Sequence, residues 1–289
     1  MSAAVSELRQ RKESGAARPV SPAPFLKWAG GKTQLLSQFE PFFPQGIERY
    51  IEPFVGGGAV FFHVAERFRP ERVVLSDSNE ELINAYVAVR DNVEGVIEAL
   101  REHRWMHSPD YYYKMRAVKP RTRTGRAARF IYLNKTCYNG LYRVNAKGEF
   151  NVPVGSYKNP KIFDAENLRL ASEALQEVDI QVRRFTDFVP SAKGGDFFYF
   201  DPPYHPISRT SSFTSYTPEA FGEEDQGRLA EVYRALDGKG CRLMLSNSDC
   251  GFVRGLYRGF RIEEVRARRA INSNGRGRGE VSELLVLNY

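Results

Sequence analysis

The stretch "YFDPPYHP", residues 199–206, places an acid, two prolines and a tyrosine directly after an aromatic run. Residues 197–200 have the length and composition of an interior strand. The prolines end that strand because they have no N–H to donate to a sheet ladder. Open α/β sheets bind ligands at the carboxyl ends of their strands. Asp201 and Tyr204 are therefore either site residues that the prolines hold in place or ordinary residues that follow the end of a strand.

The sequence on both sides of this stretch alternates strand and helix patterns, which predicts a parallel sheet flanked by helices. Asn79 is a candidate N-cap for a helix whose apolar residues recur at three- and four-residue spacing. From about residue 90 the pattern changes to basic helical stretches and then a hairpin-like segment centred on 145–148. Further strands are expected at 72–76, 180–182, 242–245 and 283–287, and a further helix near 218–236.

Positive charge is concentrated in one segment of the chain. Residues 101–161 hold 14 Lys or Arg and only three acids, a local net charge of +11 within a total of +7. The remainder therefore carries −4. A long basic segment with seven interleaved tyrosines favours a nucleic-acid partner over a merely solvated basic face.

Composition excludes several other classes of protein. No apolar run reaches the roughly 18 residues that a membrane span needs, and the N-terminus lacks the pattern of a secretory signal. The odd number of cysteines, three, favours a reducing, cytoplasmic environment. Neither these cysteines nor the four histidines have metal-ligand spacing, so no metal is expected.

Two glycine-rich stretches resemble phosphate- or nucleotide-binding turns without matching them fully. "WAGGKT", residues 28–33, fails the phosphate-loop spacing because Leu26 stands where a glycine is needed. In "EPFVGGGAVF", residues 52–61, Gly56 and Gly58 match a dinucleotide fingerprint whose third glycine is absent. Asp77 follows 19 residues after Gly58, where such folds place the acid that binds a ribose. A ribose-containing cofactor without a pyrophosphate fits this pattern.

Three separated motifs together resemble the Dam-type DNA adenine-N6 methyltransferases of the D12 class, alpha group. They are "FLKWAGGK" at 25–32, "EPFVGGG" at 52–58 and "DPPY" at 201–204, in the family's order. Further similarity lies in "YNGLYR" at 138–143 and "GEFNVP" at 148–153. The resemblance covers roughly residues 25–289.

The resemblance implies a Rossmann-like class I methyltransferase fold: a mixed seven-stranded sheet with helices on both faces. It also implies a mainly helical target-recognition insertion that contains a β-hairpin. The corresponding organisation is a flexible tail at 1–22, a catalytic domain at 23–85 and 170–289, and a DNA target-recognition domain at 86–169.

The implied methyl donor is S-adenosyl-L-methionine. Its binding residues, carried over motif by motif, are Trp28, Lys32, Glu52, Phe54, Gly56, Gly58, Asp77, Phe185 and Asp201. The catalytic residues carried over are Asp201, Pro202 and Tyr204. Asp201 and the carbonyl of Pro202 would accept hydrogen bonds from the adenine amino group, and Tyr204 would stack on a base flipped out of the duplex.

The resemblance places target contacts at Tyr138, Asn139, Leu141, Arg143 and Pro153. Arg143 matches an arginine that reads guanine, and a guanidinium suits that contact. Some family members carry a further arginine where this chain has Ser156. Reading of the first part of a GATC site is therefore better supported than reading of its last base pair. GATC in double-stranded DNA is the expected site, with a GAT-containing or relaxed site as the alternative. Arg269 and residues 274–278 are either phosphate contacts or a solvated turn.

Other functions remain open on the sequence. Cytosine-N4 methyltransferases share this active-site logic, RNA is a weaker alternative substrate, and a non-enzymatic DNA-binding protein would explain the basic segment alone. A monomer is the expected state in solution. A functional pairing with a cognate restriction endonuclease is also open.

Overall fold

A computed structural model describes residues 21–206, 221–268 and 280–289 of the 289-residue chain. Nearly all of the expected tail, together with Arg269 and residues 274–278, lies outside the described residues. No helix of the described ranges is long and apolar enough to cross a membrane.

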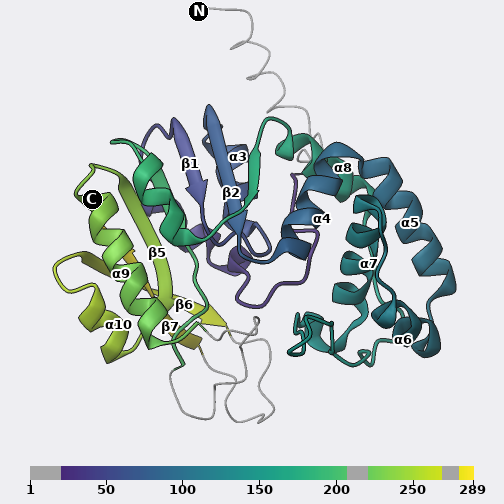
Figure 1. Cartoon of the computed structure of the whole chain (residues 1–289). Coiled ribbons are helices and arrows are strands. Elements are labelled where there is room, and N and C mark those ends of the chain that lie inside the picture. Colours follow the sequence, from purple (N-terminus) through teal and green to yellow (C-terminus); the bar gives the residue numbers. More distant parts are fainter. Residues whose placement is uncertain (1–20, 207–220, 269–279) are drawn as a thin grey trace, which may run out of the picture.

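Within the described residues, seven strands form one sheet in the order β3-β2-β1-β4-β5-β7-β6 (Figure 1). The strands β3, β2, β1, β4 and β5 pair in parallel, whereas β7 runs antiparallel to both β5 and β6. This mixed seven-stranded sheet confirms the predicted fold class. The strands are β1 (Arg49–Glu52), β2 (Arg72–Asp77), β3 (Asp179–Val182), β4 (Phe197–Phe200), β5 (Arg242–Ser248), β6 (Arg261–Arg268) and β7 (Glu280–Leu287).

Strand β6 was absent from the sequence-based expectation. Its sequence, "RIEEVRAR", is mostly charged, and among the strands that the structure describes it pairs with β7 alone, at the edge of the sheet. Charged residues on an edge strand hinder pairing with another chain. They also remove the apolar run by which an interior strand such as β4 is recognised.

Alternate residues of the central strands enter two separate cores, one on each face of the sheet. Phe197 and Tyr199 pack on one face, and Phe198 and Phe200 on the other, as the period of two requires. Helices cover both faces. They are α2 (Leu36–Phe39), α3 (Ala59–Arg67), α4 (Glu80–Asp91), α5 (Val93–Met106), α6 (Pro109–Ala117), α7 (Arg123–Thr136), α8 (Ala165–Leu175), α9 (Glu223–Asp237) and α10 (Gly251–Leu256).

Helices α4 to α8 form a layer beside the sheet (Figure 1). Asn79 caps α4, accepting hydrogen bonds from the backbone of Glu81 and Leu82, as the sequence predicted. The apolar side chains of α4, α5, α7 and α8 join the core beneath α3. The expected boundaries at 85/86 and 169/170 fall inside α4 and α8, so the helical layer shares its core with the sheet.

Candidate active site and target-recognition loop

Three carboxylates lie at the carboxyl ends of three neighbouring parallel strands. Strand β1 ends at Glu52, β2 ends at Asp77, and Asp201 follows β4 directly. From β1 the chain proceeds outward through β2 and β3 on one side, and it returns to place β4 and β5 on the other side of β1. This is the topological switch point at which open α/β sheets bind their ligands.

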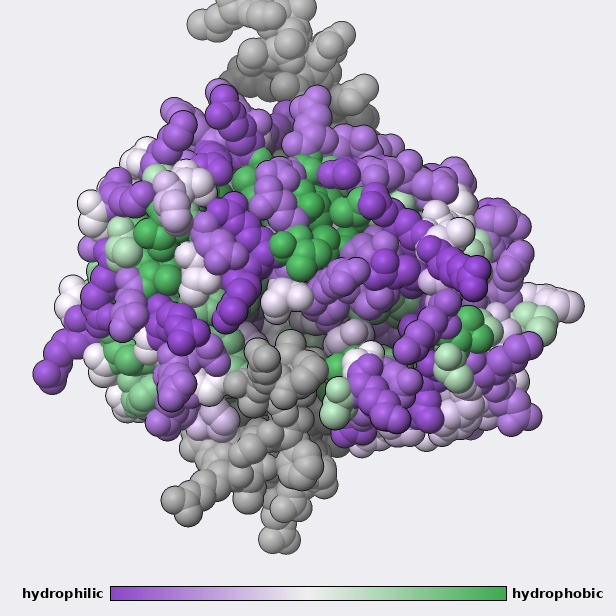
Figure 2. Space-filling model, in the orientation of Figure 1, coloured by the Kyte–Doolittle hydropathy of each residue, from purple (hydrophilic) through white to green (hydrophobic). Residues whose placement is uncertain are grey.

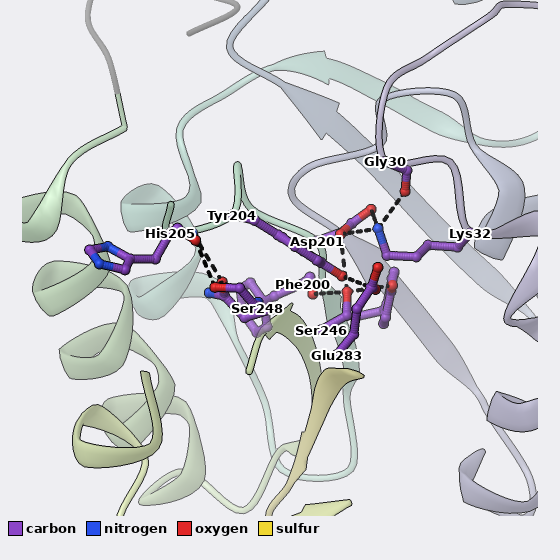
Figure 3. Close-up of polar contacts among 11 residues, drawn as sticks. Gly30, Lys32, Phe200, Asp201, Tyr204, His205, Ser246, Ser248 and Glu283 are labelled. Carbon is purple, nitrogen blue, oxygen red and sulfur yellow. Dashed lines mark hydrogen bonds and ion pairs between the residues drawn. The ribbon is translucent and has the colours of Figure 1, made fainter. Parts of the chain in front are cut away.

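Asp201 is held by a buried lysine. The Lys32 ammonium lies 2.7 Å from Oδ1 and 2.8 Å from Oδ2 of Asp201, and it also donates to the carbonyl of Gly30 (Figure 3). Only 3% of Lys32 is exposed. Burial raises the pKa of Asp201, and Lys32 opposes that rise. The lysine therefore stabilises the carboxylate form of Asp201.

The hydroxyl groups of Ser246 and Tyr199 form a chain of hydrogen bonds to the Asp201 carboxylate. Ser246, on β5, donates to Oδ1 of Asp201 at 3.0 Å. The hydroxyl oxygens of Ser246 and Tyr199 lie 2.8 Å apart. Because the Ser246 proton is donated to Asp201, the Tyr199 hydroxyl donates to Ser246. The resulting chain from Tyr199 through Ser246 fixes one side of the carboxylate.

Tyr204 and the backbone before it are also fixed in place. The Tyr204 hydroxyl donates to Glu283 of β7 at 2.8 Å, and its ring lies 4.7 Å from the Lys32 ammonium (Figure 3). Gln226 of α9 donates to the carbonyl of Pro203 at 2.9 Å. Among the described residues no group donates to the carbonyl oxygen of Pro202, which leaves this acceptor available.

Glu52 is a second buried acid beside this pair. Its side chain accepts a hydrogen bond from the Tyr50 hydroxyl at 2.7 Å, and the residue is 2% exposed. Burial raises the pKa of Glu52 well above its ordinary value, and the Asp201 charge adds to the rise. Burial thus makes ionisation of Glu52 less favourable than that of an exposed glutamate, whereas the Tyr50 hydroxyl and Lys32 favour it.

The glycine-rich turn after β1 packs against the end of β2. Asp77 accepts hydrogen bonds from the backbone N–H of Gly56 at 3.3 Å and of Asn79 at 2.9 Å. Burial raises the pKa of Asp77 to about 6 despite these donors. A carboxylate held at a strand end beside a glycine turn has the chemistry to accept hydrogen bonds from a diol such as a ribose.

Gly56 and Gly58 both adopt a positive φ, +46° and +73°. A Cβ on Gly58 would lie 2.6 Å from the Tyr86 hydroxyl, and one on Gly56 would lie 2.7 Å from the Trp28 ring. These two positions therefore require glycine. Trp28 thus packs against the turn, and it also contacts the rings of Tyr142, stacked at 6.0 Å, and Phe130, at 6.4 Å.

Aromatic rings line the far side of this turn. Phe54 and Phe185 stack with ring centroids 5.4 Å apart, and Phe221 lies 5.8 Å from each. The structure thus brings together Phe54 and Phe185, two of the three aromatic residues that the resemblance places at the cofactor. Phe221, which sequence analysis did not identify, completes the cluster.

The five expected DNA-contacting residues lie on or beside one turn, residues 138–143, called here the recognition loop. Tyr138 is 52% exposed, and Asn139 has a positive φ of +55°. Arg143 is exposed and donates to the Asn151 side chain at 2.7 Å. Pro153 accepts from the backbone of Tyr138, whereas Leu141 packs partly against the core.

The predicted hairpin is present as a short turn. Val144 and Phe150 form an antiparallel bridge around residues 145–148, and Cys137 pairs with Val154 below it. On the face in view in Figure 2, the helical layer is largely hydrophilic. The basic segment, residues 101–161, includes α6, α7 and the recognition loop, which belong to the helical part of the molecule beside the sheet (Figure 1).

Sequence analysis missed the residues that support these side chains. Ser246 was detectable, because its polar run "SNS" follows an expected strand and ends at the same edge of the sheet as Asp201. Glu283 and Tyr199 were named only as strand residues. Asn134 lies inside a helical pattern without any distinguishing sequence signal.

Comparisons with known proteins agree with this geometry. Residues 28–271 match the family model described as D12 class N6 adenine-specific DNA methyltransferase. The chain is 48% identical over 285 residues to the type II methyltransferase M.MjaIII of Methanocaldococcus jannaschii, covering 92% of this chain and 99% of the relative.

Two further relatives come from bacteria. Type II methyltransferase M1.LlaDCHI of Lactococcus lactis subsp. cremoris is 44% identical, with 92% of this chain and 95% of the relative covered. The DNA adenine methylase of Escherichia coli K12 is 38% identical, with 91% and 94% covered. By fold, motif order and full-length similarity, this chain belongs to the D12 class of N6 adenine-specific DNA methyltransferases.

Proposed function

We propose that this enzyme transfers a methyl group from S-adenosyl-L-methionine to N6 of adenine in GATC sites of double-stranded DNA. The observation that carries the proposal is the position of Asp201 and of the Pro202 carbonyl at the end of β4, beside the glycine turn and Asp77. The acceptor pair and the acid proposed to bind the ribose thus stand at the ends of β4 and β2, on either side of β1.

The residues at the glycine turn fit the proposed donor. Asp77 offers a carboxylate for the ribose hydroxyls, and the stacked rings of Phe54 and Phe185 offer an apolar wall for an adenine. The absence of a side chain at Gly58 keeps the turn close to Tyr86. When bound, S-adenosylmethionine supplies an electrophilic methyl group on its sulfonium.

The acceptor pair suits the chemistry of an adenine amino group. The lone pair of this nitrogen is delocalised into the ring, so hydrogen bonds from both of its hydrogens favour the pyramidal form that attacks the methyl group. Asp201 and the carbonyl of Pro202 would accept those bonds and stabilise the positive charge that develops. Asp201 acts as acceptor and orienter, and it forms no covalent bond.

Lys32 leaves room for this role. A carboxylate oxygen accepts more than one hydrogen bond, and Oδ2 of Asp201 receives only the Lys32 ammonium among the described residues. Tyr204, fixed through its hydroxyl by Glu283, would present its ring to the base. An adenine inside a duplex cannot reach such a site, so the target base must be flipped out of the helix.

The recognition loop supports a base-specific reaction. Arg143 presents a guanidinium suited to guanine O6 and N7, and the exposed ring of Tyr138 is suited to fill the space of a flipped base. Two relatives are named type II methyltransferases. A cognate restriction endonuclease, paired in function only, is therefore part of the proposal.

The test is methylation of plasmid DNA from a host that lacks adenine methylation, followed by single-molecule sequencing. We expect modified adenine in GATC on both strands. Asp201→Ala should abolish transfer while DNA binding persists. Asp196→Ala is a matched control, because Asp196 lies just before β4 and pairs with Arg49 at 2.9 Å. It should retain transfer when folded. Near-normal turnover by Asp201→Ala would refute the mechanism, and modification elsewhere would refute the site.

A further inference from the structure

One buried amide joins two segments that the proposed reaction uses separately. Asn134, in the last turn of α7, is 1% exposed. Its side-chain oxygen accepts from the backbone N–H of Lys27 at 2.7 Å. Its side-chain nitrogen donates to the carbonyls of Lys27 at 2.7 Å and Gly140 at 3.1 Å. Both amide protons are thereby used, so the amide orientation is fixed.

The two segments touch closely at this junction. Gly140 has a φ of +66°, and a Cβ there would lie 2.6 Å from the Cβ of Lys27. Asn139, just before it, also has a positive φ. The recognition loop therefore adopts a strained backbone conformation that persists only when neighbouring groups hold it. The Asn134 amide is one such group, because it donates to the carbonyl of Gly140.

The same junction reaches the active site through the chain that follows Lys27. Trp28 packs against Gly56 on one side and stacks on Tyr142 on the other. A few residues later, Lys32 binds both oxygens of Asp201. The recognition loop is thus held relative to the acceptor that would receive the base.

We propose that Asn134 is a positioning residue for target discrimination, acting through the recognition loop without touching DNA. This inference rests on the proposed function. Base reading depends on hydrogen bonds that tolerate only a few tenths of an ångström. A recognition loop released from Lys27 would still carry Arg143, but it would no longer hold the guanidinium at one distance from a base placed over Asp201.

The experiment compares Asn134→Ala with Asn167→Ala. Asn167, on α8, clamps the backbone of Ala23 through the same pair of hydrogen bonds, both 2.9 Å, and these bonds do not involve the recognition loop. For each variant, kcat/KM is measured on a GATC duplex and on duplexes with the guanine pair substituted. The discrimination ratio is kcat/KM on the GATC duplex divided by kcat/KM on the substituted duplex. We expect this ratio to fall about tenfold in Asn134→Ala, which is within the discrimination that one base-reading contact provides. It should stay unchanged in Asn167→Ala.

Equal discrimination by Asn134→Ala and the wild type would overturn the inference, as would an equal loss in Asn167→Ala. If Asn134→Ala does not fold, Gly140→Ala disrupts the same junction from the recognition loop. Unchanged discrimination in Gly140→Ala would also overturn the inference. If the wild type methylates adenine in another sequence, the proposed site fails. The ratio is then measured on that sequence, so the two failures are separable.

Discussion

Replacing Asp77 with asparagine should stabilise the donor-free protein at neutral pH while it weakens donor binding. The carboxylate is partly buried, with the backbone N–H groups of Gly56 and Asn79 as its donors. Its pKa is nevertheless raised from 3.8 to about 6, because burial outweighs those donors. The folded protein thus holds an ionised group that it would stabilise better in neutral form.

The size of the effect follows from that shift. About two pKa units correspond to roughly 3 kcal/mol of destabilisation when the acid is ionised. Residual solvent contact screens this cost, so about 1.5 kcal/mol is realistic. Asparagine keeps one acceptor oxygen, and loss of the longer bond from Gly56 costs about 0.5 kcal/mol. The net gain for Asp77→Asn is about 1 kcal/mol above pH 7.

The difference in the free energy of unfolding between Asp77→Asn and the wild type should depend on pH. A carboxyl whose pKa is raised in the folded state costs stability above that pKa, and the cost disappears as pH falls from about 6 towards 3.8. The advantage of Asp77→Asn should therefore shrink over this range. Below it, only the loss of the Gly56 bond remains, and the variant becomes slightly less stable than the wild type.

Urea unfolding of the donor-free proteins at pH 8, 6 and 4.5 measures these differences in the free energy of unfolding. Calorimetry with S-adenosylmethionine measures the accompanying loss of affinity. Asp187→Asn, at an exposed position, is the control and should show neither effect. A variant less stable than the wild type at pH 8, or a difference independent of pH, would refute the reasoning.

Three further substitutions test other parts of the structure. Gly58→Ala should cost about 2 kcal/mol in thermal unfolding and weaken donor binding in calorimetry, because its φ is positive and the new Cβ would meet the Tyr86 hydroxyl. Ser246→Ala removes a donor from Asp201 and should lower the single-turnover rate constant for methyl transfer about tenfold with DNA affinity unchanged. An unaltered rate constant would contradict that role. Arg143→Ala should lower discrimination at the guanine position by about 1–3 kcal/mol in competition assays, and an unchanged profile on substituted sites would count against it.

The sequence predicted the central strands well because their patterns are set by burial on both faces. Strand β4 begins and ends where the aromatic run does, and Asp201 follows it because proline stops the ladder. Asp77 was placed by its spacing from Gly58 at the end of the next strand. In each case a local signal coincides with a strand end, and parallel strands bring their ends together.

The partners of these residues could not be predicted in the same way. Lys32 was assigned to the cofactor by its motif, yet in the structure its ammonium contacts both oxygens of Asp201, 169 residues away. That pairing depends on how the segment before α2 lies relative to the end of β4, which no local pattern encodes. Strand β6 was missed for the opposite reason, since an edge position permits charged residues that hide the strand pattern.

Asn134 shows why support of this kind escapes sequence analysis even when the supported motifs are recognised. An asparagine inside a helix usually competes with the helix backbone and reads as a weak position. Here the side chain satisfies three backbone groups outside the helix, two on the distant residue Lys27 and one on Gly140 of the recognition loop. A buried amide without these partners would cost about 1–3 kcal/mol, so its presence is explained only by the folded junction. The identity of the motif residues follows from chemistry, whereas the relative position of the motifs depends on such junctions.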